Sequence, residues 1–340
     1  MDVLAHIIKP VEDDLERYKA LFEADFDHDN PLLHLALQHI RKRQGKRLRP
    51  VLMLLVARAL STDNSAFVDE CILNASVSIE LLHTASLVHD DIVDESDQRR
   101  GQASVNALLS PQAAVLVGDY LLSKSLQHSA ATRNTDVVNN IAVIGQLLAD
   151  GELLQLYNIS TETLAEEPYF EVIKRKTASL FRASAQIGAL LSGASEESIN
   201  AMSRYGEYLG ICFQIRDDIF DYDKNAEVGK PIGNDMREGK LTLPILHAVL
   251  EAQVRADKEA LCPDAKAMTE LTLKVRRLEC TEEEMQSLVQ FAIEQGGVEY
   301  AYLKMEEYAK KATEQLALLP DSSAKDSLRM LAEYVVQRRV

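Results

Sequence analysis

Two short acidic segments have residue types and a spacing that could do chemistry. Both follow the pattern Asp-Asp-x-x-Asp, and their members are Asp90, Asp91 and Asp94 in the first and Asp217, Asp218 and Asp221 in the second. Each segment ends a long apolar stretch that we expect to be helical. Residues four apart are neighbours on a helix, so the first and last aspartates of each segment should share a face. His83 falls on the stripe of the first segment, and Gln214 lies one turn before the second.

Either segment alone would suit a solvated acidic helix end, because short acidic runs are common on helix surfaces. Three features argue against this for the pair. Like charges four residues apart destabilise a helix, and each cluster approaches a helix C-terminus, where the dipole is already negative. The residues between the carboxylates are large and apolar, and the pattern occurs twice in similar contexts. We therefore interpret the segments as two carboxylate walls of a cavity.

Carboxylates that face each other repel by about 1–4 kcal/mol per close pair at surface-like dielectric, and a hard cation with oxygen ligands relieves that repulsion. Mg²⁺ takes few carboxylates, keeps some waters and fills its remaining positions with substrate phosphates. The two segments therefore predict a diphosphate bridged to both acidic walls by Mg²⁺. A di-iron site in a helical bundle would call for Glu-x-x-His pairs, and neither segment has one.

Basic residues gather in four clusters that could complete an anion site. Each cluster alone is more often a solvated face or a basic helix end. In a chain with 53 acidic and 37 basic residues, however, basic clusters beside two acidic ones indicate an anionic substrate, since Arg and Lys are the usual phosphate partners. The clusters contain Lys46, Arg47 and Arg49; Arg99 and Arg100; Lys174, Arg175 and Lys176 with Thr177; and Lys230, Arg237 and Lys240.

The rest of the sequence predicts the helices that must position these acidic and basic side chains. Apolar residues recur at intervals of three and four in long segments, β-branched alternation is scarce, and Gly (14) and Pro (9) are few. We expect helices over residues 68–93, 113–129, 137–157, 169–191, 199–222 and 241–256, with further helices elsewhere. No long linker or fixed repeat divides the chain, so we predict one all-α domain over residues 1–340. Such a bundle can place polar side chains in its centre.

Bulk composition limits the classes of partner. The net charge of −16 argues against a nucleic-acid partner or an anionic membrane surface. The four cysteines are far apart and predict neither a disulfide framework nor a zinc site. The N-terminus is acidic and amphipathic, unlike a signal peptide, and we expect no run of transmembrane length. We therefore expect a soluble cytoplasmic protein without stable membrane insertion.

Five motifs, in their order and at their intervals, resemble the trans-isoprenyl diphosphate synthases, the polyprenyl synthetase family. They are GKRLRP, LLHTASLVHDDIVDESDQRRG, KTASLF, FQIRDDIFDY and GKPIGNDMREGKLTLPIL. The resemblance runs from about Leu32 to about Leu250, and more loosely to the C-terminus. It is closest in look to the long-chain, octaprenyl-type members. It implies an antiparallel helical bundle around a central cavity, usually a homodimer, that binds about three Mg²⁺ ions with its substrates.

The resemblance also implies a role for each matching residue. The six aspartates correspond to the two metal-binding motifs, with Asp221 acting less directly. Arg99 and Lys176 are expected to act in catalysis beside them. The residues that match those holding isopentenyl diphosphate are Lys46, Arg49, His83 and Arg100. The residues that match those holding the allylic diphosphate are Arg99, Lys176, Thr177, Gln214, Lys230 and Lys240.

The implied chemistry agrees with these residue types. Breaking the allylic C–O bond releases diphosphate, and cations aimed at its growing charge stabilise the transition state more than the ground state. The carbocation left behind needs an apolar pocket without water. The alkene of isopentenyl diphosphate then attacks and a proton is lost, so no side-chain nucleophile is required.

Two alternatives share part of this pattern. A terpene cyclase also ionises a prenyl diphosphate with a DDxxD motif, but it usually carries an Asn/Ser/Glu-type second motif. It would also not need the isopentenyl-binding GKRLRP and QRRG segments. A non-catalytic partner subunit tends to lose catalytic aspartates, whereas this sequence retains all six. An activity assay on the chain alone would separate these cases.

Product length is predicted from the residues before the first motif. In short-chain synthases a bulky aromatic residue commonly stands four or five positions before it, and here those positions hold Ser86 and Ala85, with Leu82 and Ser78 expected below. Close helix packing could also explain small residues there. We predict an all-trans product of about six to ten isoprene units (C30–C50), as in quinone side chains, because a packed pocket cannot stretch beyond its volume. A farnesyl or geranylgeranyl diphosphate synthase is the alternative. The pocket floor is expected among Ile144, Leu147 and Leu148.

Overall fold

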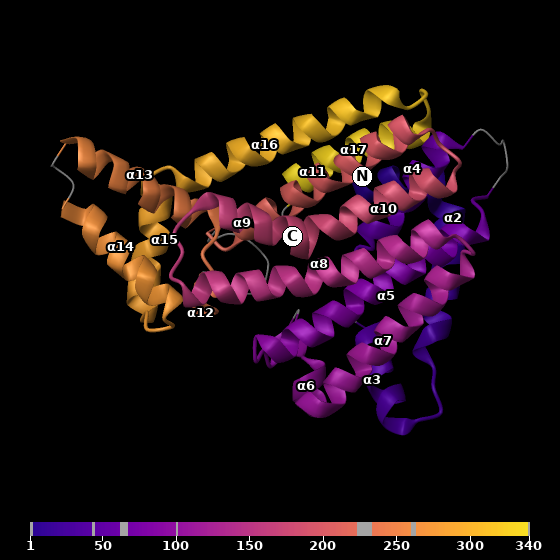
Figure 1. The fold of residues 1–340 in the computed structure, drawn as a ribbon, viewed down its shortest axis with the longest axis horizontal. Coiled ribbons are helices and arrows are strands. Elements are labelled where there is room, and N and C mark those ends of the chain that lie inside the picture. The colour runs from indigo at the N-terminus through magenta and orange to yellow at the C-terminus, as the bar shows by residue number, and fades with distance from the viewer. Residues whose placement is uncertain are drawn as a thin grey trace. The chain divides into compact units, whose positions relative to one another are not determined.

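The computed structural model describes residues 3–42, 45–61, 67–99, 101–222, 233–259 and 263–338. Over these ranges the chain is helical almost throughout, and the only strands are two of two residues each (Figure 1). This confirms the predicted all-α class. Two predicted substrate-binding residues, Arg100 and Lys230, lie outside the described residues.

Contacts within the chain gather into two compact units. Unit 1 consists of Met1–Gln146, Ser179–Glu207 and Ala312–Tyr334, and unit 2 consists of Leu147–Ala178, Tyr208–Lys311 and Val335–Val340. The first acidic motif belongs to unit 1 and the second to unit 2. The single domain over residues 1–340 stays a prediction.

The helices and strands fall into three groups by the unit to which their residues belong, and Figure 1 labels the main ones. Those wholly in unit 1 are α1 (Val3–Ile8), η1 (Lys9–Val11), α2 (Glu12–Glu23), η2 (Ala24–Phe26), α3 (Pro31–Arg41), α4 (Leu48–Leu60), α5 (Glu70–Val93), β1 (Gln98–Arg99), β2 (Gln102–Ala103), α6 (Val105–Leu108), α7 (Pro111–Ala131), α10 (Ser179–Leu191) and η4 (Leu316–Leu318). Those wholly in unit 2 are α9 (Glu166–Ile173), the π-helix η3 (Lys174–Ala178), α12 (Asn234–Arg237), α13 (Leu243–Glu259), α14 (Pro263–Arg276) and α15 (Glu282–Glu294). Those with residues in both units are α8 (Thr135–Ser160), α11 (Glu196–Phe220), α16 (Gly297–Gln315) and α17 (Ser323–Gln337).

The core of unit 1 forms where α5 packs along α7 and where α4 packs on α5 and α10 (Figure 1). Asp69 caps α5 by accepting a hydrogen bond from the Cys71 N–H at 2.7 Å. The helix α4 is buried continuously from Pro50 to Ala57. A Cβ added at Gly188 of α10 would lie 2.7 Å from the Met53 carbonyl oxygen, so glycine permits the close approach of α10 to α4.

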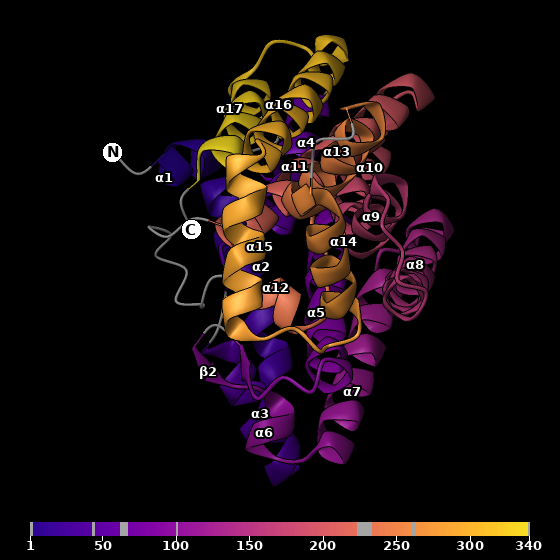
Figure 2. The same cartoon turned by 90° about the vertical axis from the view of Figure 1, so that its left-hand side faces the viewer.

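In unit 2, α13, α14 and α15 pack against one another (Figure 2). The start of α15 carries a capping box, in which Thr281 accepts from the Glu284 N–H and Glu284 accepts from the Thr281 N–H. These two hydrogen bonds provide a local start signal for α15, which lies outside the six helical segments that we predicted by residue range.

The predicted helical segments agree with the structure to within a few residues at each end, with η3 interrupting the segment 169–191. Two helices, α5 and α8, are long and apolar enough to cross a membrane by length and composition alone, which differs from our expectation that no run reaches that length. In α5 the apolar window is 61% buried, as in the core helix of a folded domain, whereas in α8 it is 22% buried.

Candidate active site

The first acidic motif lies at the C-terminal end of α5. Asp94 follows the helix, and its N–H donates to the Asp90 carbonyl oxygen at 2.8 Å, so these residues lie one turn apart as predicted. Both remain partly exposed, whereas Asp91 is buried. The Asp91 Oδ1 accepts a hydrogen bond from Arg99 Nε at 2.5 Å. The β1–β2 hairpin thus places the Arg99 guanidinium against Asp91. Its positive charge compensates the charge of this buried carboxylate.

One face of α5 packs on α7. Ser78 and Ser125 each donate to the other's carbonyl oxygen at 2.8 Å, and both are fully buried. Eleven residues later, His89 contacts α7 at Gly118, where an added Cβ would lie 2.1 Å from the imidazole Nε2. A helix turns about 100° per residue, so Ala85 shares this stripe with Ser78 and His89. Ser78 is therefore small because α7 packs against it, and the buried Ala85 lies on the same side of α5.

A different face of α5 carries the predicted substrate residues. Ser86 precedes Asp90 by one turn, is partly exposed, and its hydroxyl donates to the His83 carbonyl oxygen at 2.8 Å. Helical geometry therefore places Ser86, His83 and Asp90 on one side of the helix. Of the two small residues before the motif, Ser86 alone lies on this side. On α8, the expected floor residues are Ile144, which is buried, and Leu147 and Leu148, which are half-buried.

The loop before α4 presents two of the predicted cations. Lys46 is exposed, with its ammonium 5.6 Å from the centre of the Tyr334 ring. Arg49 is half-buried in the first turn of α4, and its guanidinium lies 4.9 Å from the centre of the Phe181 ring. Aromatic faces attract cations, so the rings help to hold both side chains in place.

Arg47, between these cations, has a different environment. Its backbone is left-handed, with φ of 53°, and its side chain is buried. The guanidinium lies 5.7 Å from the ring centre of Tyr18 and 5.5 Å from that of Phe22, both on α2. This contact anchors the loop on α2, so Arg47 positions its neighbours and does not face the same way as Lys46.

The second acidic motif lies at the end of α11, and Asp218 is its buried member. Asp218 accepts hydrogen bonds from the Tyr169 hydroxyl at 2.6 Å and from the Gln214 amide at 2.8 Å. The side-chain oxygen of Gln214, Oε1, in turn accepts a hydrogen bond from the Thr177 hydroxyl at 2.7 Å. Burial raises the pKa of Asp218 to about 7, although both hydrogen bonds oppose this increase. The predicted residues Thr177, Gln214 and Asp218 thus form one chain, to which the structure adds Tyr169.

Asp217 of this motif is partly exposed, with 41% of its side chain accessible. Its Oδ1 pairs with the guanidinium of Arg338, close to the C-terminus. Sequence reasoning did not single out Arg338, because a cation 121 positions away leaves no local signal.

Asp221 directs its carboxylate at the segment that follows. Its two oxygens accept hydrogen bonds from the N–H groups of Asn234 at 2.9 Å and Asp235 at 3.1 Å. Its carbonyl oxygen accepts from the Gly233 N–H at 3.1 Å. Asp221 therefore fixes the start of α12, from which the chain continues to Lys240. The Lys240 ammonium donates to Glu238 at 2.7 Å.

Lys176 and Thr177 lie on η3, a π-helical turn between α9 and α10. Single π-helical turns inside α-helices often occur at functional sites. The Lys176 ammonium pairs with Glu152 of α8 and also lies 3.4 Å from Gln155 Oε1. A Cβ added at Gly151 would lie 2.9 Å from Lys176 Cγ, so glycine lets α8 approach η3. Glu152 is a site residue that our sequence analysis missed, although an acid inside an apolar helix was a visible signal.

The donors present suit Mg²⁺. Within the described ranges, no three His, Cys, Asp or Glu side chains converge into a ready metal cage. Each motif instead offers two partly exposed carboxylates, Asp90 and Asp94 in unit 1 and Asp217 and Asp221 in unit 2, and each motif also pairs with a guanidinium. Mg²⁺ is commonly held by one or two carboxylates together with waters and substrate phosphates, so a sparse carboxylate set fits it.

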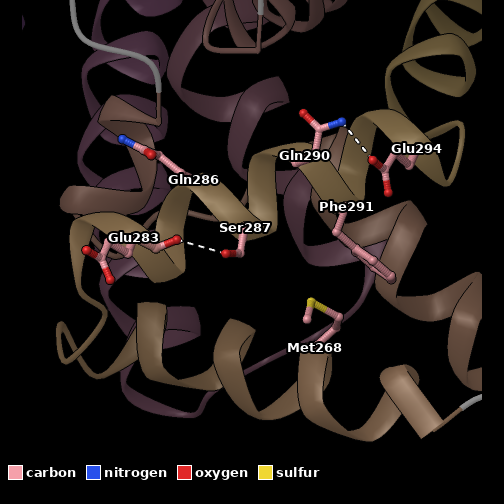
Figure 3. A pocket seen from close by; sticks show the side chains of 7 residues that line it. All are labelled: Met268, Glu283, Gln286, Ser287, Gln290, Phe291 and Glu294. Carbon is pink, nitrogen blue, oxygen red and sulfur yellow. Dashed lines mark hydrogen bonds between the residues drawn. The ribbon is translucent and has the colours of Figure 1, made fainter.

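A separate groove of about 470 Å³ lies between α14 and α15 (Figure 3). Met268 and Phe291 line it with apolar surface, and the other lining residues are Glu283, Gln286, Ser287, Gln290 and Glu294. The described residues that line it include no Lys or Arg, so this lining does not suit a diphosphate. It also contains none of the predicted site residues.

Comparison with known proteins identifies the family. The family model described as polyprenyl synthetase matches residues 30–276, a range that contains both acidic motifs and the basic segments between them. This chain belongs to the polyprenyl synthetase family. The resemblance stated from the five motifs is thereby confirmed, and with it the assignment as a transferase that condenses prenyl diphosphates.

Three similar proteins cover nearly the whole of this polyprenyl synthetase. An octaprenyl diphosphate synthase from Haemophilus influenzae is 34% identical over 98% of this chain and 96% of its own. The crystal structure of a geranylgeranyl pyrophosphate synthase from Bacteroides thetaiotaomicron is 44% identical, with a TM-score of 0.82 over 99% of this chain and 100% of its own. That of a polyprenyl synthase from Caulobacter crescentus, complexed with calcium and isoprenyl diphosphate, is 30% identical, with a TM-score of 0.88 over 99% of this chain and 98% of its own.

Proposed function

We propose that this prenyltransferase adds isopentenyl diphosphate repeatedly to an allylic diphosphate and makes a long all-trans chain, of the kind found in quinone side chains. The observation that carries the proposal is the small, partly exposed Ser86 one turn before Asp90, where a bulky side chain would block a growing chain. The octaprenyl name of the Haemophilus influenzae relative supports it. The expected length is about six to ten isoprene units, because the pocket volume sets the limit.

The described residues form two groups, one for each diphosphate substrate. Lys46, Arg49 and His83 hold isopentenyl diphosphate, and Lys176, Thr177 and Gln214 hold the allylic partner, with Lys240 near it. Arg100 and Lys230, outside the described residues, keep their predicted roles. Asp90, Asp94 and Asp217 present carboxylates for about three Mg²⁺ ions, which neutralise the charge on the leaving diphosphate when bound. The calcium in the Caulobacter crescentus complex supports a divalent cation.

We also propose a homodimer in the cytoplasm. Large apolar side chains are exposed along α7 and α8, including Leu116 at 67%, Leu153 at 65% and Tyr157 at 62%. Covering such side chains with a second copy would remove apolar surface from water. This would also account for an apolar α8 that is mostly unburied, without a membrane. Sedimentation of the purified chain should give a dimer at micromolar concentration, and a monomer would refute this part of the proposal.

A short-chain product is the second candidate. The geranylgeranyl pyrophosphate synthase from Bacteroides thetaiotaomicron has higher identity to this chain, at 44%, than the octaprenyl synthase, at 34%. The packing role of Ala85 also removes one of the two residues on which a long product was predicted. The chain length of the product that the purified enzyme makes decides between these two candidates.

The activity itself is tested on the chain alone. Purified protein with labelled isopentenyl diphosphate and a short allylic primer should incorporate label in Mg²⁺ and lose incorporation in a chelator. Asp90→Ala and Asp217→Ala should each lower turnover by several orders of magnitude, since a lost metal ligand removes several kcal/mol of transition-state stabilisation. Unchanged circular dichroism shows that the variants fold. Near-normal turnover in a folded variant, or no turnover in the parent chain, would contradict the proposal.

A further inference from the structure

The side chain of Arg338 is enclosed beside the second acidic motif. Only 6% of it is exposed, and its guanidinium pairs with Asp217 Oδ1. The same terminal nitrogen donates to the Phe213 carbonyl oxygen at 3.0 Å. The guanidinium also lies 3.8 Å from the centre of the Phe213 ring and 5.6 Å from that of Phe220. Stacking and hydrogen bonding together hold this cation against one carboxylate oxygen.

The backbone at Arg338 is fixed as well. Its carbonyl oxygen accepts a hydrogen bond from Arg216 Nε at 2.9 Å. Arg216 is buried, and its guanidinium lies 4.6 Å from the Phe220 ring centre and donates to the Tyr302 hydroxyl at 2.6 Å. Arg338 is therefore bound to α11 through both its side chain and its backbone. All these groups belong to unit 2.

The arrangement has a consequence for metal binding. Asp217 and Asp218 are adjacent carboxylates, and the positive charge of Arg338 offsets their repulsion when no metal is bound. Arg338 occupies Oδ1, while 41% of the Asp217 side chain remains exposed. A divalent cation that binds Asp217 meets a guanidinium already on that carboxylate. Like charges that share a ligand repel, so the guanidinium must weaken the attraction of the site for the metal.

We propose that Arg338 is an internal counter-cation of Asp217, a positioning residue that competes with the divalent metal and lowers the affinity of the free enzyme for it. The metal is then retained well only when diphosphate adds negative charge to the site. This inference rests on the proposed metal role of Asp217. It assigns to Arg338 control over metal binding at the second motif.

The test measures Mg²⁺ binding to the full chain by calorimetry, without substrate and then with inorganic diphosphate. Arg338→Met keeps an unbranched apolar side chain over Phe213 and removes the charge. It should bind Mg²⁺ alone about threefold to tenfold more tightly than the parent, a difference that shrinks with diphosphate present. Arg338→Lys, which keeps a positive charge, should lie close to the parent. The control Arg329→Met removes an exposed arginine of α17 that pairs with Asp326, and should change nothing.

Unchanged or weaker Mg²⁺ binding by folded Arg338→Met would overturn the inference. If Arg338→Met does not fold, Arg338→Gln takes its place, because it also removes the charge and should also tighten Mg²⁺ binding. In Asp217→Asn, the charge-removing substitution should leave metal binding unaltered, and a persisting effect contradicts the pairing. Asp217→Asn also separates the two hypotheses. If it binds Mg²⁺ like the parent, the metal role of Asp217 fails; if it weakens binding while Arg338→Met has no effect, only the present inference fails.

Discussion

Asp218 lies between two hydrogen-bond donors, Tyr169 and Gln214, in a position from which water is excluded. Desolvation disfavours its charged form, whereas the donors favour that form. Desolvation has the larger effect, and the pKa of Asp218 rises to about 7. The second motif thus holds one carboxylate accessible to a cation and one whose charge depends on pH near neutrality.

The raised pKa of Asp218 predicts how stability depends on pH. The folded chain keeps a proton on Asp218 that the unfolded chain releases near pH 4, so the free energy of unfolding of metal-free protein should fall as pH rises from about 4 through 7. Asp218→Asn should flatten this part of the profile. Urea unfolding in a chelator at several pH values measures both. The assignment fails if the parent and Asp218→Asn show the same slope across that window.

Ser86 and Ala85 are a matched pair for testing which face of α5 meets substrate. Ser86→Phe should shorten the product to about three or four units while the first condensation continues, because it fills a volume that the growing chain needs. Ala85→Phe should instead destabilise the fold by about 1–3 kcal/mol, since α7 leaves no room for the ring. Product chromatography and thermal melts of both variants check this. Two truncating variants of normal stability would show that Ala85 also faces the pocket.

At the scale of elements, the π-helical turn η3 depends on a close approach of α8. Gly151 of α8 contacts η3 so closely that an added Cβ would lie 2.8 Å from Arg175 Cβ and 2.9 Å from Lys176 Cγ. Glu152, the next residue, binds the Lys176 ammonium. One turn of α8 therefore sets both the position and the charge partner of a predicted catalytic lysine.

Gly151→Ala is expected to move η3 and raise the KM for the allylic diphosphate by about tenfold, because small displacements of a binding group are costly. The KM for isopentenyl diphosphate should change much less. Gly145→Ala is the control, since it lies on the same helix and an added Cβ there meets nothing within 4 Å. It should leave both constants unchanged and stabilise α8 by up to about 1 kcal/mol. Equal effects of the two substitutions on kinetics would refute the role of the close approach.

At the scale of the whole molecule, the sequence predicted the helices and both acidic motifs because these depend on local periodicity and short spacing. It did not predict Tyr169, Glu152 or Arg338 as partners of site residues. Tyr169 meets Asp218 across 49 positions and Arg338 meets Asp217 across 121, so these contacts depend on how helices pack. The sequence also left open which side of α5 carries Ala85. The contacts of Ser78 and His89 with α7 show which side of this helix faces α7.

The central claim, repeated prenyl transfer to a long product, is tested most directly by sizing what the unmodified enzyme makes. The purified chain is incubated with Mg²⁺, labelled isopentenyl diphosphate in excess and farnesyl diphosphate as primer, and the hydrolysed products are separated by reversed-phase chromatography. We expect a main product of about six to ten isoprene units, because the small, partly exposed Ser86 should leave room for a long chain. A product that stops at three or four units under these conditions would contradict the long-chain account and favour the short-chain alternative.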